Sequence, residues 1–250
     1  MLRSFSKCYG EKEIDSINTE EVITFLNDPT TKNGQSTKYL RYSHLKAFFN
    51  FCINGFNLKV KNPCNNSILR KMYRMPKLPR KRYIDKETID EMIFRTENAR
   101  NRLILELQAR GGLRIGEVLK FTPKCVDGRK LILEKPKSGR EYEVAFIPQR
   151  VAERLKEYIA QKRIQPNEKI FPLTYSGARH VVKKAATKLV IDISPHDLRR
   201  HSATYASRNG IPLEIISKII LRHSDLSTTQ RYLGKIDDSE ATRWIETLYG

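Results

Sequence analysis

The chain has 250 residues, 39% of them hydrophobic, which is enough for one large folded domain or two ordinary ones. It carries 47 Lys and Arg against 28 Asp and Glu, and the resulting net charge of +19 is spread along the whole length. This charge indicates a polyanionic partner. Nucleic acid fits better than a membrane, because no apolar run approaches the roughly 18 residues of a spanning helix and the N-terminal stretch lacks a signal-peptide segment.

The four cysteines form no C-x-x-C pair and have no histidines at metal-ligand spacing. We therefore expect neither a metal site nor a disulfide framework. Free thiols are typical of a reducing, intracellular setting, so we expect a cytoplasmic protein.

The first predicted helix begins at Asn18, because Asn18 and Glu21 match a capping-box variant before the apolar stretch "VITFL". A second helix is predicted after the loop "TTKNGQS" and ends at Gly55. Its apolar residues recur at helical spacing: Leu45, Phe48, Phe49, Cys52 and Ile53.

Three basic residues of this second helix lie off its apolar stripe: Lys38, Arg41 and Lys46. Such residues form either an ordinary solvated face or a surface that contacts phosphates. The charge of the whole chain raises the second possibility, so they are candidate DNA-binding residues.

The stretch "RKMYRMPKLPRKR", residues 70–82, carries seven basic residues, two prolines and no acid. It predicts an extended linker, and the boundary between two domains belongs here. We expect a helical N-terminal domain at 1–75, a basic linker at 76–83 and a larger domain at 84–250. The linker is either a plain tether or a segment that lies along DNA through four residues: Lys77, Arg80, Lys81 and Arg82.

The larger domain is predicted to be mostly helical with a small antiparallel sheet, so the whole chain is mainly α. Asp85 caps a helix through "KETIDEMIF", and "RNRLILELQA" forms another that runs into Gly111 and Gly112. The β-rich stretches "RKLILE" and "EYEVAFIP" flank the hairpin turn "KPKSG". Four helical patterns follow: "VAERLKEYIAQKR", "ARHVVKKAATKLV", "HDLRRHSATYASRNG" and "PLEIISKIIL".

Three further stretches and the "KPKSG" turn concentrate residues that suit phosphoryl transfer without a metal. The stretches are "GGLRIGE" with Arg114 and Glu117, "HDLRRH" with His196 and Arg199, and "LRHSDLSTTQRY" with His223 and Tyr232.

Each residue type in these stretches has a chemical reason to be there. Guanidinium groups bind nonbridging phosphate oxygens, imidazole and ammonium groups move protons, and a tyrosine oxygen can attack phosphorus. Because the tyrosine pKa is ordinarily about 10, Tyr232 needs nearby cations and a proton acceptor. Attack on a phosphodiester would conserve the bond energy in a phosphotyrosine ester, so resealing needs no ATP and no other cofactor.

In this order the stretches resemble the tyrosine recombinases, the family of phage integrases and Xer-type resolvases. The resemblance covers nearly the whole chain, from "STKYLRYSHLKAFFNFC" in a core-binding domain through the linker "MPKLPRKR" to the catalytic domain. Its strongest parts are "GGLRIGEVLKF" and "SPHDLRRHSATYASRNGIPLEIISKIILRHSDLSTTQRY", with nine residues from His223 to Tyr232.

The resemblance implies a role for each matching residue. Arg114 and Arg199 would hold the scissile phosphate, and Tyr232 would be the nucleophile. His196 and His223 would complete the phosphate pocket and assist proton transfer.

Three other positions are implied less directly. Lys137 matches the hairpin lysine that protonates the departing 5′ oxygen, with Lys135 as the runner-up because hairpin length varies. Glu117 matches an acidic position that orients its neighbours. Arg222 departs from the pattern, which has glycine before the second histidine; it either reaches DNA or reflects a more open turn.

The function implied is site-specific recombination by a homotetramer on two double-stranded DNA sites, with a 3′ phosphotyrosine intermediate and no small-molecule substrate. A type IB topoisomerase and a catalytically silent DNA-binding regulator are the alternatives. The small core-binding domain and the linker favour recombination, and the full catalytic set argues against a regulator.

The C-terminal tail is predicted to form a helix capped by Asp238, which docks either on its own domain or on a neighbouring protomer. Its apolar stripe consists of Ala241, Trp244, Ile245 and Leu248. Tyr249 lacks the preceding histidine motif and is a poor candidate for the nucleophile.

Overall fold

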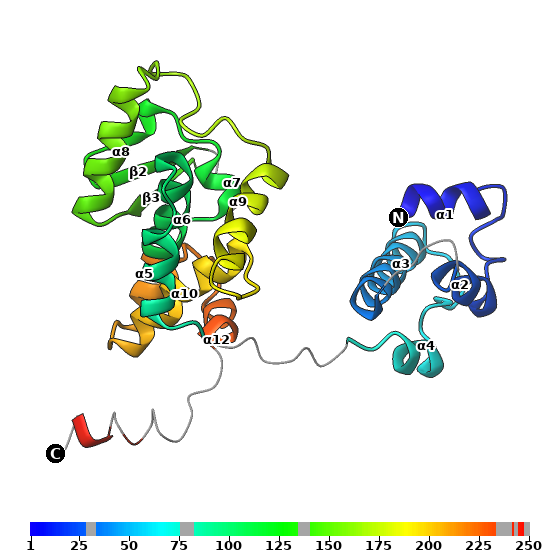
Figure 1. Cartoon of the computed structure of the whole chain (residues 1–250). Helices are drawn as coiled ribbons and strands as arrows, with labels where there is room; N and C mark the ends of the chain where they lie inside the picture. The colour runs from blue at the N-terminus through cyan, green and yellow to red at the C-terminus, as the bar shows by residue number, and fades with distance from the viewer. Residues whose placement is uncertain (29–33, 76–82, 135–140, 234–241, 243–244, 248–250) are drawn as a thin grey trace. The chain divides into compact units, whose positions relative to one another are not determined.

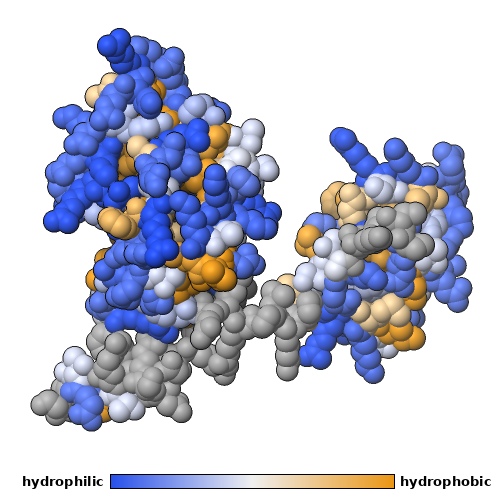
Figure 2. Space-filling view, in the orientation of Figure 1, coloured by the Kyte–Doolittle hydropathy of each residue, from blue (hydrophilic) through white to orange (hydrophobic). Residues whose placement is uncertain are grey.

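The computed structural model describes residues 1–28, 34–75, 83–134, 141–233, 242 and 245–247, apart from the side chains of 231 and 232. The chain divides into two compact units, residues 1–81 and 82–250 (Figure 1). In the visible face of each unit, hydrophilic side chains cover most of the surface between smaller apolar patches (Figure 2). Within the described part, no helix is both long enough and apolar enough to cross a membrane.

The first unit is helical. Its helices are α1 (Leu2–Tyr9), α2 (Thr19–Leu26), α3 (Gln35–Gly55) and α4 (Ser67–Met72). The predicted capping box is present, because the Asn18 side chain accepts from Glu21 N and the Glu21 carboxylate accepts from Asn18 N. The predicted stripe of α3 supplies Leu45 and Phe49 to a core that also contains Phe5 from α1.

The second unit is mostly helical with one three-stranded antiparallel sheet, so the predicted fold class is confirmed. Its helices are α5 (Lys86–Phe94), α6 (Ala99–Gly111), α7 (Ile115–Val118), α8 (Gln149–Gln161), α9 (Tyr175–Thr187), α10 (Pro195–Arg208), α11 (Leu213–Ile215) and α12 (Leu226–Leu233). Two further helical turns are η1 (Pro123–Cys125) and η2 (Ile216–Ile220), and the strands are β1 (Val126–Asp127), β2 (Lys130–Glu134) and β3 (Tyr142–Phe146).

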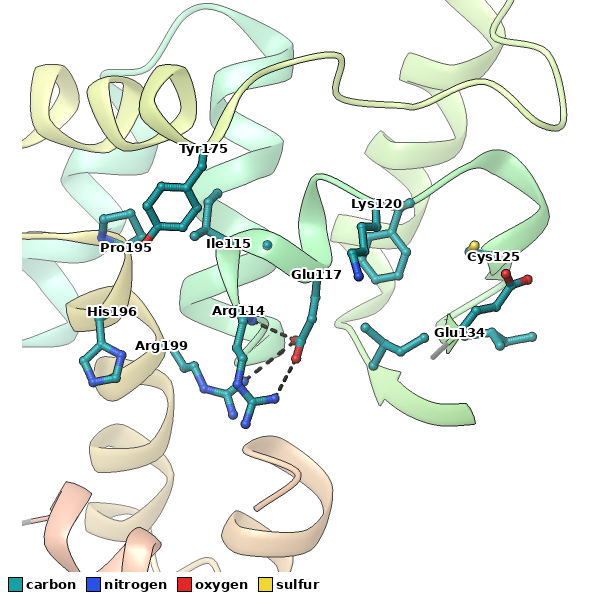
Figure 3. Close-up of a pocket in the computed structure, with 14 residues that line it drawn as sticks. Arg114, Ile115, Glu117, Lys120, Cys125, Glu134, Tyr175, Pro195, His196 and Arg199 are labelled. Atoms are coloured by element: carbon teal, nitrogen blue, oxygen red, sulfur yellow. Dashed lines mark hydrogen bonds and ion pairs between the residues drawn. The ribbon is translucent and has the colours of Figure 1, made fainter. Parts of the chain in front are cut away.

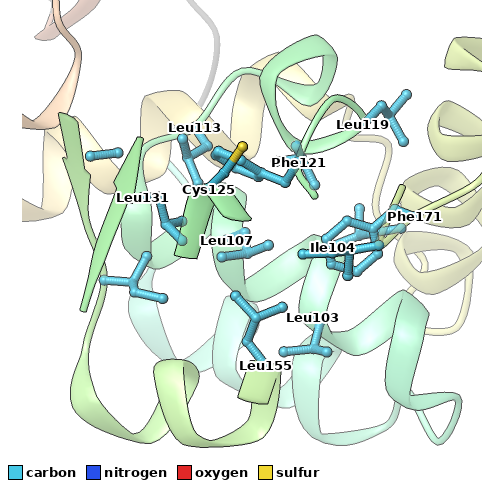
Figure 4. Packing of buried hydrophobic residues seen from close by; sticks show 14 of the residues in the cluster. Leu103, Ile104, Leu107, Leu113, Leu119, Phe121, Cys125, Leu131, Leu155 and Phe171 are labelled. Carbon is cyan, nitrogen blue, oxygen red and sulfur yellow. The ribbon is translucent and has the colours of Figure 1, made fainter. Parts of the chain in front are cut away.

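Helix α6 is the centre of this unit and contacts α5, α7, α8, α9 and α10 (Figure 1). Its Leu107 packs in a large apolar cluster with Leu131 of the sheet, Leu155 of α8 and Phe171 (Figure 4). Seven consecutive residues of α6, 103–109, are buried, so this part of the helix is enclosed on all sides by the rest of the unit. Residues that follow α6 are therefore held on a rigid support.

The register of the hairpin is set by its alternating pattern. Leu131 pairs with Ala145 and Leu133 pairs with Glu143, and all four side chains are buried. Because alternate residues of a strand face the same side, Glu143 occupies a position that would ordinarily be apolar. A carboxylate there requires a polar or charged partner.

The stretch "PLEIISKIIL", predicted to be one helix, is a short turn of α11 followed by the π-helical segment η2. Leu221 N donates to Ile216 O at 2.8 Å, which is an i to i+5 bond. The stretch is therefore helical as predicted, but its C-terminal half is π-helical and not α-helical. A π-turn widens the helix by one residue and changes the direction of the chain that follows, here Leu221 to His223.

Candidate active site

The turn after α6 brings Arg114 close to the segment before α12. Gly112 has φ +61°, and a Cβ atom there would lie 2.7 Å from the carbonyl oxygen of Ile220. Only glycine combines this backbone conformation with so close an approach. Gln108 Nε2 also donates to the carbonyl oxygen of Pro195 at 3.1 Å, which ties α6 to the start of α10. Three stretches that are distant in the sequence therefore meet.

Arg114 is the N-cap residue of α7 and is held by Glu117. The Glu117 carboxylate accepts from the backbone N of Arg114 at 2.8 Å and from its Nη1 at 2.6 Å. Burial acts to raise the pKa of Glu117, but the charge of Arg222 and the hydrogen bonds from Arg114 outweigh it and lower this pKa. The carboxylate is therefore ionised and fixes one edge of the Arg114 guanidinium.

Arg199 and His196 come from the first two turns of α10. The Arg199 side chain is 2% exposed, and its guanidinium donates to the carbonyl oxygens of Gly112 and Leu221. Its Nη1 also lies 3.9 Å from Glu117 Oε2. His196 is exposed at the mouth of the same pocket. Arg199 is thus fixed from within the protein, whereas His196 faces outward.

A pocket of about 620 Å³ joins these side chains. Figure 3 shows the ends of Arg114 and Arg199 next to each other below Glu117, with His196 on the far side of Arg199. Tyr175, at the start of α9, lines another part of the wall. Two guanidinium groups beside an imidazole form a cationic pocket that suits a phosphate group.

His223 is oriented by a chain of hydroxyl groups. Its Nδ1 lies 2.9 Å from Thr229 Oγ1, and the Thr229 hydroxyl donates to Ser217 Oγ at 2.9 Å. Because the Thr229 hydroxyl donates its proton to Ser217, its oxygen accepts from Nδ1–H of His223. Nε2 of His223 is then the basic atom. Burial and the charges of Arg199 and Arg114 lower the pKa of His223 from 6.5 to about 4, so its imidazole is neutral at pH 7.

Arg222 is 5% exposed and is turned into the protein, with φ +50°. Its Nη2 donates to Glu117 Oε2 at 2.9 Å and its Nη1 donates to the carbonyl oxygen of Ile220 at 2.9 Å. Its Nε lies 3.8 Å from Glu143 Oε2. The sequence suggested a DNA contact or a more open turn for Arg222, and this buried position does not fit a DNA contact.

The side chains of the remaining catalytic candidates lie outside the described residues. Tyr232 belongs to α12, which packs against α10 and η2, but its side chain lies outside the described residues. Thr229, the partner of His223, precedes Tyr232 by three residues in the same helix. Lys135 and Lys137 lie in the segment 135–140, which is also outside the described residues.

Three of the candidate DNA-binding residues belong to the first compact unit, and the other four belong to the predicted linker. Lys38, Arg41 and Lys46 lie on α3 and are half-buried. Arg41 packs over the ring of Phe25 at 4.8 Å and donates to its carbonyl oxygen. Four candidates lie outside the described residues: Lys77, Arg80, Lys81 and Arg82.

Sequence reasoning missed Thr229, Ser217 and Glu143. Thr229 is one of three consecutive hydroxyl residues, a pattern that by itself indicates only a helix start. Glu143 had a usable signal, since it is a charged residue at an inward position of a predicted strand. Over the part of the chain that the structure describes, no group of three or more His, Cys, Asp or Glu side chains could hold a metal ion.

Comparisons with known proteins point to one family. Residues 82–238 match the model of the phage integrase family. A tyrosine recombinase of Pseudothermotoga lettingae is 27% identical over 245 residues, covering 92% of this chain and 81% of that protein. The tyrosine recombinase XerA of Thermococcus onnurineus is 30% identical over 219 residues, covering 80% of this chain and 72% of that protein. The solved Tn1549 transposon integrase in complex with transposon right end DNA has a similar fold, with a TM-score of 0.75, 16% identity, and coverage of 95% of this chain and 87% of that chain.

Proposed function

This chain belongs to the phage integrase family, and we propose that it is a site-specific recombinase that breaks and rejoins DNA strands through Tyr232. The family match spans more than half of the chain. The single observation that carries the proposal is the pocket in which Arg114, His196 and Arg199 come together from two distant stretches, with His223 near enough for their charges to lower its pKa.

The two arginines are suited to hold one phosphodiester. Arg199 is oriented by two backbone carbonyl oxygens and Arg114 by the carboxylate of Glu117, so neither needs to reorganise when a phosphate binds. Donors fixed in advance stabilise the charge that develops on the nonbridging oxygens more than mobile ones do. This arrangement supports binding of the scissile phosphate by Arg114 and Arg199.

In the proposed reaction the Tyr232 oxygen attacks phosphorus and its proton passes to His223. The bond from phosphorus to the 5′ oxygen breaks, and that oxygen takes a proton from Lys137, or from Lys135 if the hairpin register differs. The product is a 3′ phosphotyrosine ester and a free 5′ hydroxyl. Attack by the 5′ hydroxyl of another strand reverses the steps and completes the exchange.

The low pKa of His223 fits the role of proton acceptor. A neutral imidazole can take a proton, and the cations that lower its pKa are the groups proposed to bind the phosphate. A bound phosphate offsets their charge, so the pKa of His223 rises when the substrate is in place. His223 then becomes a stronger base at the moment when Tyr232 must lose its proton.

We propose further that residues 1–75, which make up most of the first unit, are a DNA core-binding domain and that the basic linker 76–83 follows the DNA backbone. The net charge of +19 and the DNA in the Tn1549 integrase complex support double-stranded DNA as the partner of this chain. Site-specific exchange between two sites requires four active sites, so the proposed assembly is a homotetramer on paired sites of cytoplasmic DNA.

The test is a covalent adduct on Tyr232. DNA recovered in covalent linkage from the native host supplies the target, and a nicked duplex of that site loses its short 5′-hydroxyl fragment after cleavage, which traps the adduct. We expect trapping in EDTA, because the arginine pair offsets the charge that a metal ion would otherwise offset. Tyr232→Phe should bind the site nearly normally and give no adduct.

Tyr249→Phe and Tyr205→Phe are the matched controls and should give the wild-type adduct. Peptide mass spectrometry that finds the nucleotide on Tyr249 or Tyr205, or trapping that depends on added metal, would overturn the proposal. Exchange between two sites, rather than relaxation of supercoils by a monomer, separates recombination from topoisomerase activity.

A further inference from the structure

Arg222 stands where the backbone favours glycine. Its φ of +50° lies in the left-handed region, which side chains other than glycine rarely adopt. Its side chain is nevertheless buried, and burial of a guanidinium is unfavourable unless carboxylates and hydrogen bonds compensate for it. An arginine that is disfavoured both by its backbone and by its burial must make interactions that glycine could not.

Two carboxylates flank the Arg222 guanidinium, that of Glu117, which is half-buried, and that of Glu143, which is buried. Glu117 Oε2 accepts from Nη2 at 2.9 Å, and Glu143 Oε2 lies 3.8 Å from Nε. Both Arg222 Nε and Glu143 Oε2 are buried, and among the residues that the structure describes neither atom has a hydrogen-bond partner. Since buried polar atoms are nearly always paired, these two atoms are each other's natural partner.

Glu143 is the more unusual of the two carboxylates because of its place in the sheet. It pairs across the hairpin with Leu133, in a register whose other inward members are apolar. An ionised carboxylate at such a position needs a nearby positive charge. Within the described residues, the ion pair recorded for Glu143 is the one with Arg222.

We propose that Arg222 is a positioning residue that offsets the buried charge of Glu143 and thereby leaves Glu117 to hold Arg114. This inference rests on the proposed function, because it assigns Arg222 to the support of the phosphate pocket. The residue touches neither phosphate nor nucleophile in this role. It acts through Glu117 and through strand β3.

The charge of the cluster shows why this matters. Glu117 and Glu143 face three guanidinium groups, those of Arg114, Arg199 and Arg222, which leaves one net positive charge. With glycine in place of Arg222 the charges would cancel, and the pocket would lose its attraction for a phosphate. Arg222 also links α7 to β3, the strand that follows the hairpin turn.

The experiment is a double-mutant cycle on the full chain with four proteins: wild type, Arg222→Gly, Glu143→Gln and the double variant. Glycine suits the backbone at 222, so the substitution removes the guanidinium without adding strain. Two readouts are used: the rate of adduct formation at saturating nicked duplex, alongside the duplex Kd, and the midpoint of thermal unfolding without DNA.

Two matched controls separate this effect from general ones. Arg163→Gly makes the same substitution at an exposed arginine with φ +52°, and Glu141→Gln removes an exposed carboxylate two residues before Glu143. Both controls should leave the rate and the unfolding midpoint unchanged.

We expect Arg222→Gly to slow adduct formation at least about tenfold and to lower the unfolding midpoint, and we expect Glu143→Gln alone to change the rate by less than about threefold. Adding Glu143→Gln to Arg222→Gly should make adduct formation at least about fivefold faster than in Arg222→Gly alone and should raise the unfolding midpoint. Additive effects in both readouts, or a double variant that folds no better than Arg222→Gly, would overturn the inference. If wild type forms no adduct, the proposed function fails while the unfolding cycle still decides the charge compensation.

Discussion

The hydroxyl groups of Thr229 and Ser217 determine which nitrogen atom of His223 can act as a base. Thr229 is fully buried and Ser217 nearly so, and their hydrogen bond leaves the Thr229 oxygen only an acceptor role towards His223. A histidine with a fixed tautomer reacts faster than one that must reorient, which is why the group behind a catalytic histidine matters. Thr229 is therefore a positioning residue for the proposed proton transfer from Tyr232.

We expect Thr229→Val to slow adduct formation by about tenfold to a hundredfold with little change in DNA affinity, because valine keeps the shape and loses the oxygen. It also leaves the buried Ser217 hydroxyl unpaired, at a stability cost of about 1–3 kcal/mol. Single-turnover rates and Kd values on the nicked duplex measure the effects on adduct formation and on DNA affinity separately. Thr229→Ser retains the oxygen and is the control; a serine variant as slow as the valine variant would contradict this role.

At the same scale, the sequence predicted the site unevenly. The motif order identified Arg114, His196, Arg199 and His223, because short motifs with fixed spacing can be recognised in one sequence. The structure brings these four residues together. The surroundings of Arg222 could not be predicted from the sequence. Its partner Glu117 precedes it by 105 residues, and no local pattern reports a contact across that separation.

Among the elements, long periodic helices and capped starts were predicted best. Asn18 and Asp85 cap their helices as expected, and the two predicted β-rich stretches pair as the antiparallel strands β2 and β3. The four-residue helix α7, the two-residue strand β1 and the π-turn η2 were missed or misjudged. They contain too few residues to show a period, and tertiary contacts such as that of Gly112 with Ile220 determine them.

The hairpin element carries the prediction about the leaving group. We expect Lys137→Ala to slow cleavage of ordinary DNA about a hundredfold or more, because the departing 5′ oxygen then lacks a proton donor. A substrate with sulfur at the 5′ bridging position should restore the rate, since a thiolate leaves without protonation. The measurement compares cleavage rates on the two substrates. If the sulfur substrate rescues Lys135→Ala but not Lys137→Ala, the proton donor is Lys135 and not Lys137.

At the scale of the whole molecule, the chain divides into two compact units, and the division falls in the part of the sequence where proline and basic residues accumulate. Composition predicts such a boundary because a run of basic residues broken by prolines packs poorly into a core, although the structure places the start of the run in the first unit, where Tyr73 is buried in the core. Composition does not predict how many chains assemble, since this depends on surfaces that meet only in the complex. The tail is the part of the chain that bears most directly on assembly.

The tail stripe of Ala241, Trp244, Ile245 and Leu248 lies outside the described residues except for Ile245, whose side chain is 57% exposed. A large apolar side chain at that exposure is stabilised by burial against a partner surface. We expect deletion from Asp237 onward to weaken complexes on paired sites at least about tenfold more than binding to one site. Gel-shift titrations on one-site and two-site duplexes measure the difference.

The point variant Ile245→Ala should reproduce part of this loss, whereas Glu246→Ala, its exposed neighbour, should not. Adduct formation on a single site checks that the deletion leaves Tyr232 working, since the deletion begins five residues after it. A tail that docks on a neighbouring protomer adds its buried area once for every subunit contact, so the loss should grow with the number of subunits in the complex. If deletion weakens one-site and two-site complexes equally, or leaves the larger complexes intact, the tail docks on its own domain.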